Sequence, residues 1–146
     1  MTSPTTHIAI QRISKLPGIP SDLRLRKWVR AALMQPAQLT LRIVNAAEGC
    51  RLNTAFRGKP YATNVLTFVY HETNAARLFG DIILCAPVLA AEARAQGKML
   101  RDHYAHMVIH GVLHLSGMDH AKPREATKME ALEIALLADL EIANPY

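Results

Sequence analysis

Apolar and polar residues alternate along two short segments near the start of the chain, and two later segments are short β-rich runs, as is typical of strands. The segments predicted as strands cover residues 7–13, 38–44, 64–70 and 81–85, and the last two are expected to pair with each other. Between the first two strands, apolar residues recur every three or four positions. This pattern predicts a helix that is capped by Ser21 or Asp22, reaches about Gln35 and stops at Pro36. A further short helix is predicted over residues 46–56.

The second half of the chain is helical in pattern. One helix is predicted over residues 87–96, with Gly97 as its C-cap, and another begins at Pro123 or Arg124. Between them, residues 100–116 are apolar on nearly every side, which predicts a helix buried in the centre of a domain. No repeat or linker divides the sequence. We therefore predict a single α+β domain over residues 1–146, with about four strands and about five helices.

Composition narrows the class of protein further. The chain has 146 residues, of which 50% are hydrophobic and 20% charged, as in a soluble globular domain. Its formal net charge of +5 is compatible with polyanionic partners. Cys50 and Cys85 stand far apart and are expected to be reduced, packed thiols. No secretory signal and no apolar run of about 18 residues is visible, so we expect a cytoplasmic protein without a membrane partner.

The densest chemical signal is the segment HGVLHLSGMDH, residues 110–120. His110 and His114 are four residues apart, so on a helix they share one face. Gly117 can adopt the left-handed conformation that ends a helix, after which His120 can swing back to the same ion. Three imidazoles suit one Zn²⁺ ion with a fourth position open for water, whose pKa the ion lowers towards about 7. A lone histidine in a buried helix is usually a core residue, but this triple spacing favours metal binding.

The role of the metal and of the neighbouring residues stays open at this point. The zinc is either catalytic or structural, and nickel or another transition ion also fits three imidazoles. His106 is excluded as a ligand, because it lies about 12 Å along the helix axis from His114. We expect His103 and His106 to be packing, supporting or surface residues. Asp119 either orients a ligand imidazole or is an ordinary turn residue.

Two residues decide which bond the metal would hydrolyse. Zinc proteases of the metzincin type have the same ligand spacing, but they carry a general-base glutamate where this chain has Gly111. Proteolysis is therefore disfavoured. A phosphodiester needs cations for the charge on its equatorial oxygens. Arg57, in a predicted turn with Lys59 beside it, is the leading candidate for a catalytic guanidinium.

These motifs resemble the bacterial YbeY family of single-strand-specific, metal-dependent endoribonucleases. Residues 110–120 match the family pattern H-G-x-L-H-L-x-G-x-D-H at every fixed position. LNTAFRGKPYATNVLTF, FGDIILC and the C-terminal EATKMEALEIALLADLEIANPY resemble further family segments, so that the resemblance runs from about Gln38 to the end. Two departures are Val69, where many members have proline, and a short segment over residues 71–78.

The resemblance implies a small mixed sheet, with the metal site at the end of the central buried helix. It implies zinc on His110, His114 and His120, and catalytic roles for Arg57 and His114. The implied substrate is single-stranded or ribosomal RNA, in ribosomal RNA maturation and ribosome quality control. The implied partners are the small ribosomal subunit and assembly factors. The alternatives are a non-catalytic ribosome-assembly factor with a structural zinc and, less favoured, a zincin-like metalloprotease.

Overall fold

The computed structural model describes residues 5–119 and 121–146. These residues form four strands and five helices. In chain order they are β1 (His7–Arg12), α1 (Asp22–Ala32), β2 (Ala37–Val44), α2 (Ala46–Arg57), β3 (Val65–Val69), β4 (Leu78–Cys85), α3 (Ala86–Gln96), α4 (Leu100–Leu115) and α5 (Pro123–Asp139). The predicted α+β class with about four strands and five helices is confirmed.

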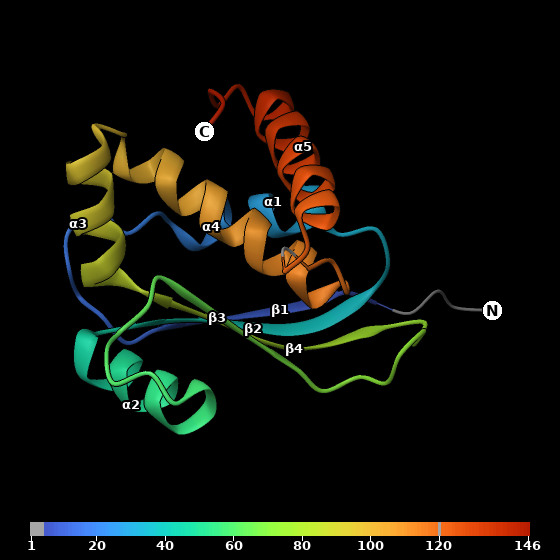
Figure 1. Cartoon of the computed structure of the whole chain (residues 1–146), viewed down its shortest axis with the longest axis horizontal. Helices are drawn as coiled ribbons and strands as arrows, with labels where there is room; N and C mark the ends of the chain where they lie inside the picture. Colours follow the sequence, from blue (N-terminus) through green and yellow to red (C-terminus); the bar gives the residue numbers. More distant parts are fainter. Residues whose placement is uncertain (1–4, 120) are drawn as a thin grey trace.

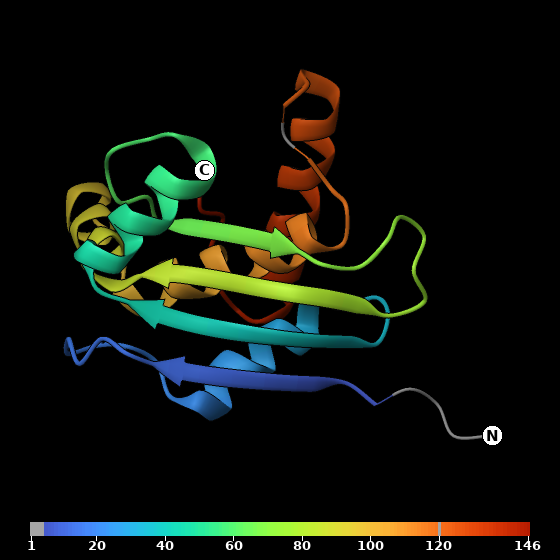
Figure 2. The ribbon, with the colours of Figure 1, turned by 90° about the horizontal axis from the view of Figure 1, so that it is seen from below.

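The four strands form one mixed sheet in the order β1-β2-β4-β3 (Figure 2). β1 pairs with β2, and β2 with β4, in parallel, whereas β3 runs antiparallel to β4. β4 begins at Leu78, three residues before the predicted start at Asp81. Its first residues pair with the start of β2, where Ala37 lies opposite Leu78. In this strand order β3 lies at one edge of the sheet, and it also contacts α4.

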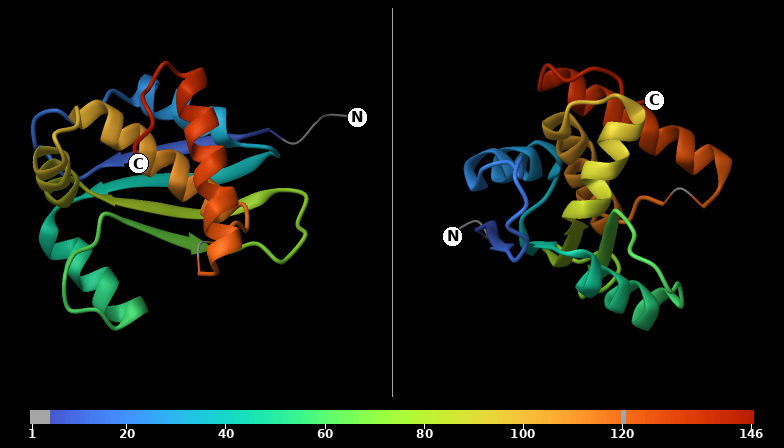
Figure 3. Two further views of the ribbon diagram at one scale, coloured as in Figure 1. Left: turned by 45° about the horizontal axis from the view of Figure 1, so that its top comes forward. Right: turned by 90° about the vertical axis from the view of Figure 1, so that its left-hand side faces the viewer.

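The helices cover the two faces of the sheet unequally (Figures 1 and 3). α1, α4 and α5 lie above the sheet in Figure 1, whereas α2 lies below it, at the end near α3. α4 is the central helix, because it contacts α1, α3 and α5 as well as β3 and β4. α1 ends at Ala32, before the predicted Gln35, and its N-cap Ser21 accepts a hydrogen bond from the backbone N–H of Arg24 at 3.2 Å.

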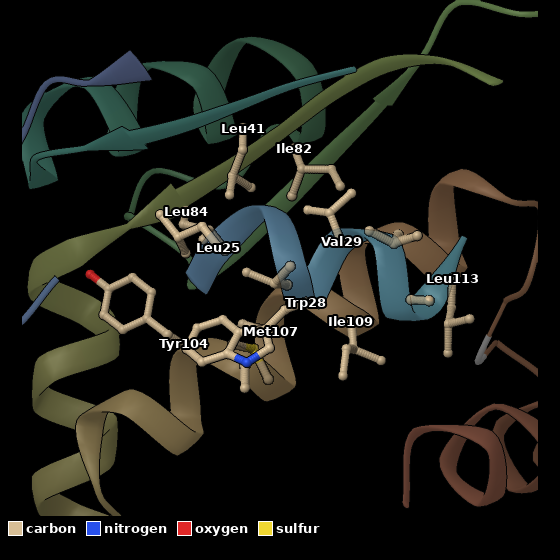
Figure 4. Close-up of a cluster of buried hydrophobic side chains, with 14 of the residues drawn as sticks. Leu25, Trp28, Val29, Leu41, Ile82, Leu84, Tyr104, Met107, Ile109 and Leu113 are labelled. Carbon is tan, nitrogen blue, oxygen red and sulfur yellow. The ribbon is translucent and has the colours of Figure 1, made fainter. Parts of the chain in front are cut away.

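The main core lies between the sheet, α1 and α4 (Figure 4). Leu25 and Val29 of α1 are fully buried, as are Leu41 of β2 and Ile82 of β4. Each such side chain contributes roughly 1.5–3 kcal/mol to stability through burial. Eleven of the sixteen residues of α4 are buried, which confirms the predicted central helix. This burial holds α4 rigidly against the sheet.

A smaller apolar cluster lies on the other face of the sheet, between the sheet and α2. Its buried members are Val44, Leu66, Ile83 and Cys85. Cys50 and Cys85 are both free thiols, as predicted. None of the helices in the described residues is long and apolar enough to cross a membrane.

Candidate metal centre

A pocket opens between β3 and the C-terminal half of α4, with a cavity volume of about 430 Å³. It is lined by Arg57, Thr63, Asn64, Val65, Leu66, Thr67, Phe68, His110 and His114. Three of the four residues singled out from the sequence therefore meet at one cavity. They come from two helices that are far apart in the chain, α2 and α4.

His110 and His114 occupy successive turns at the end of α4. Their ring centroids are 6.0 Å apart, and both side chains are partly exposed. Two imidazoles on one tetrahedral zinc ion would have centroids about 5 Å apart, given Zn–N distances near 2.1 Å. The rings need to close by only about 1 Å, so the pair fits one metal ion.

The chain reverses direction directly after this pair. Gly117 has φ +101°, and the backbone N–H of Met118 bonds to the carbonyl of Leu113 at 3.1 Å. This is the predicted left-handed glycine at a helix end. The predicted third ligand, His120, lies outside the described residues. Residues 5–119 and 121–146 contain no set of three ligating side chains that could hold a metal, so the three-histidine site stays a prediction.

The carboxylate of Glu133 on α5 contacts the ring of His110 through Nδ1. Glu133 is fully buried, and its Oε1 lies 2.8 Å from Nδ1 of His110. Its Oε2 lies 2.9 Å from Nε2 of His106 and accepts a 2.6 Å hydrogen bond from the hydroxyl of Tyr146. A carboxylate on one ring nitrogen of a ligating histidine orients the ring and leaves the other nitrogen for the metal.

The charge state of Glu133 follows from these contacts. Burial by itself would raise the pKa of its carboxyl group. The hydrogen bonds from His106, His110 and Tyr146 outweigh burial and lower the pKa to about 2. Glu133 is therefore a carboxylate at neutral pH. An anion here favours a proton on Nδ1 of His110, and this tautomer presents the lone pair of Nε2.

Glu133 and Tyr146 were missed in the sequence. A signal for Glu133 existed, because it lies four residues from both Met129 and Leu137 and so shares their buried helix face. A charged residue at such a position is rare unless it is paired. Tyr146 carried no comparable signal. Its approach depends on the path of the chain after α5.

The other two histidines of α4 are structural, as expected. His106 bonds to Glu133, and His103 lies with its Nε2 2.9 Å from Oε1 of Glu92 on α3. Glu92 also accepts a hydrogen bond at 3.2 Å from the side-chain amide of Asn64, a residue that lines the pocket. His103 thus anchors α3 and the start of β3 beside the site.

Arg57 is the last residue of α2, whereas the sequence placed it in a turn. Its side chain is exposed and forms no ion pair with any residue in the ranges 5–119 and 121–146. A guanidinium without a carboxylate partner keeps its donors available for an anion. Lys59, its predicted companion cation, is exposed but does not line the pocket.

Gly111 faces the sheet and is not among the residues that line the pocket. A Cβ atom at this position would lie 2.8 Å from Cγ2 of Ile82 and 3.5 Å from Cγ2 of Val65. The glycine therefore allows α4 to pack closely on β4 and β3. Asp119 accepts a 3.1 Å hydrogen bond from the backbone N–H of Ala121, which is the turn role considered for it.

The fold and the pocket define a class of protein: a single small α+β domain with a candidate metal site beside an arginine. The chain belongs to the family described as Endoribonuclease YbeY, whose model matches residues 19–141. The predicted family is thereby confirmed. The match begins earlier than the Gln38 boundary inferred from the motifs, and it includes α1. An endoribonuclease is a hydrolase of internal phosphodiester bonds in RNA, which is the activity that the resemblance implied.

Relatives from three bacteria carry the name Endoribonuclease YbeY. The protein of Thiobacillus denitrificans is 49% identical over 144 residues, which cover 99% of this chain and 98% of its own. That of Aromatoleum aromaticum is 54% identical over 87% of this chain and 81% of its own. That of a Janthinobacterium species is 55% identical over 90% and 88%. The solution structure of a Thermotoga maritima protein has the same fold, with a TM-score of 0.56 and 24% identity over 90% of this chain and 91% of its own.

Proposed function

We propose that this protein is a metal-dependent endoribonuclease that cleaves single-stranded RNA at the pocket between β3 and α4. The observation that carries the proposal is the meeting of Arg57 with His110 and His114 at one cavity. Two candidate metal ligands beside an arginine that has no carboxylate partner among the described residues suit a phosphodiester, whose reaction develops negative charge on its oxygens.

The metal would be one Zn²⁺ ion held by His110, His114 and His120, and it would supply positive charge and Lewis acidity at the phosphate. The donor set fits, since two of the three imidazoles converge and one is oriented by a buried carboxylate. Arg57 would donate hydrogen bonds to the non-bridging phosphate oxygens. Nothing on α4 supplies the general base of a protease, because position 111 is a glycine packed on the sheet.

The cellular role proposed with this activity is maturation and quality control of ribosomal RNA in the cytoplasm. The partners would be the small ribosomal subunit and its assembly factors. The net charge of +5 supports an RNA partner, because cations displace the counterions that surround the phosphate backbone.

A comparison of three proteins tests the proposal: the wild type, His114→Ala and Arg57→Ala. Metal content, thermal stability and cleavage of a labelled single-stranded RNA are measured on each. His114→Ala is expected to lose metal and cleavage together. Arg57→Ala is expected to keep its metal and its stability but to lose about 10²–10³-fold in kcat/KM, the effect of removing one donor to developing charge.

The outcomes separate catalysis from a structural metal. Full cleavage by metal-free His114→Ala would refute metal-dependent chemistry. If chelation lowers stability and ribosome association while highly purified wild type shows no cleavage, the protein is an assembly factor with a structural zinc. Arg57→Lys serves as the matched control, because it keeps the charge but loses the two-pronged hydrogen bonding of arginine.

A further inference from the structure

Two phenylalanine rings meet beside the pocket. Phe68 of β3 lines the cavity, and Phe56 of α2 precedes Arg57 directly in the chain. Their ring centroids are 4.8 Å apart with an interplanar angle of 68°, an edge-to-face contact. Phe56 is nevertheless 65% exposed. A large apolar ring is therefore presented to solvent beside the candidate site.

The apolar core does not account for the position of Phe56. The smaller cluster, between the sheet and α2, contains Phe68 among its partly buried members, but Phe56 is not part of it. In an edge-to-face pair, one ring offers only its edge, so both of its faces stay uncovered by the other ring. Because Phe56 is mostly exposed, part of its π-surface faces solvent next to Phe68, which lines the pocket.

The charges around this surface favour a nucleic acid strand over an apolar protein partner. Arg57 is about 3.8 Å from Phe56 along the backbone, the spacing of consecutive Cα atoms. Arg57 has no carboxylate partner among the described residues, and Lys59 follows two positions later. A cation beside an exposed aromatic ring is the combination with which proteins hold phosphate and base together in single strands.

We propose that Phe56 and Phe68 form a stacking subsite for a nucleobase adjacent to the phosphate that Arg57 binds. This inference rests on the function proposed above and deepens it, because it gives a physical reason for preferring single strands. Only an unpaired, unstacked base can turn its face to a protein ring. A base in a duplex is stacked on both sides and cannot enter the subsite.

A second aromatic pair offers a matched control. Tyr70 and Phe79 also make an edge-to-face contact, with centroids 5.4 Å apart, and their exposed fractions are 56% and 47%. Neither of these two residues lines the pocket, whereas Phe68 of the first pair does. If exposed aromatic surface were enough for RNA binding, Phe79→Leu and Phe56→Leu would weaken it equally.

The test measures RNA binding by fluorescence anisotropy on the full chain, with chelator present to prevent cleavage. The probe is a labelled single-stranded octanucleotide RNA, compared with the same strand in a duplex. We expect Phe56→Leu to raise the Kd for the single strand about 5- to 150-fold, the range for loss of one stacked base. The Kd for the duplex should not change. Phe79→Leu should leave both unchanged, and Phe56→Trp should bind the single strand at least as tightly as wild type.

A base-deletion series shows whether the lost affinity belongs to stacking. Octanucleotides with one abasic position each are titrated against wild type and Phe56→Leu. At one position, removal of the base should weaken binding by wild type but not by Phe56→Leu, because the two changes delete the same contact. On the enzyme with its metal, Phe56→Leu should raise KM and leave kcat within twofold.

Three results would overturn the subsite. They are equal Kd values for wild type and Phe56→Leu, equal losses in Phe56→Leu and Phe79→Leu, and additive effects at every abasic position. Failure of the proposed function would look different, since wild type itself would then not cleave single-stranded RNA, whereas the comparison of Kd values does not depend on cleavage. Thermal unfolding of Phe56→Leu within a few degrees of wild type excludes a folding defect.

Discussion

Replacement of Glu133 by glutamine tests how the buried carboxylate supports the candidate metal ligand. Its two oxygens face three groups: Nδ1 of His110 at 2.8 Å, Nε2 of His106 at 2.9 Å and the hydroxyl of Tyr146 at 2.6 Å. Glutamine has the same shape, but one of its oxygens becomes an NH₂ group that can only donate. Either a contact is therefore lost, or the proton of the His110 ring must move to its other nitrogen.

The new amide can take either of two orientations, and each disturbs the hydrogen bonds that support His110. If the NH₂ group faces His110, Nδ1 must become an acceptor, and the proton moves to Nε2, the nitrogen left for the metal. If it faces His106 and Tyr146, both lose their acceptor; His106 is buried, and an unsatisfied buried group costs about 1–3 kcal/mol. Removal of such a supporting carboxylate typically lowers metal affinity 10- to 100-fold, which is about 1.4–2.7 kcal/mol.

The assay is a zinc titration in competition with a chromophoric chelator, on wild type, Glu133→Gln and Tyr146→Phe. Tyr146→Phe removes one of the two donors to Oε2 and should have the smaller effect. Glu125→Gln, an exposed change on the same helix, controls for the loss of one negative charge. A zinc Kd for Glu133→Gln within twofold of wild type would refute the supporting role.

Two further predictions concern stability. Burial raises the pKa of Tyr104 to about 12, above its ordinary value of 10.0. The neutral phenol therefore stabilises the folded state fully below pH 10. This contribution is lost as the pH rises through 12. Urea unfolding at pH 9–12 should show a smaller alkaline loss for Tyr104→Phe, and an unchanged loss would contradict this. Gly111→Ala should destabilise by about 1 kcal/mol, because crowding against Ile82 exceeds the gain in helix propensity. The loss should shrink in an Ile82→Ala background, and identical losses in both backgrounds would contradict the packing argument.

The elements of the fold were largely readable from the sequence because each depends on local periodicity. The cap at Ser21 and the buried character of residues 100–115 lie where the pattern placed them. The errors concerned the ends of helices and strands; α1, for example, ends at Ala32 and not at the predicted Gln35. The end of the helix at Gly117, three residues after His114, was also predictable from the local sequence, since a left-handed glycine ends a helix wherever it occurs.

By itself, the sequence determined the pair His110 and His114, because a spacing of four on a helix places two side chains on one face whatever surrounds them. Only the tertiary structure brought Arg57 to their pocket and Glu133 to the back of His110. These contacts join three helices whose mutual positions depend on which apolar faces pack together. Hydrophobic burial is non-directional. The apolar pattern of each helix therefore predicts that the helix packs, but not which element it packs against.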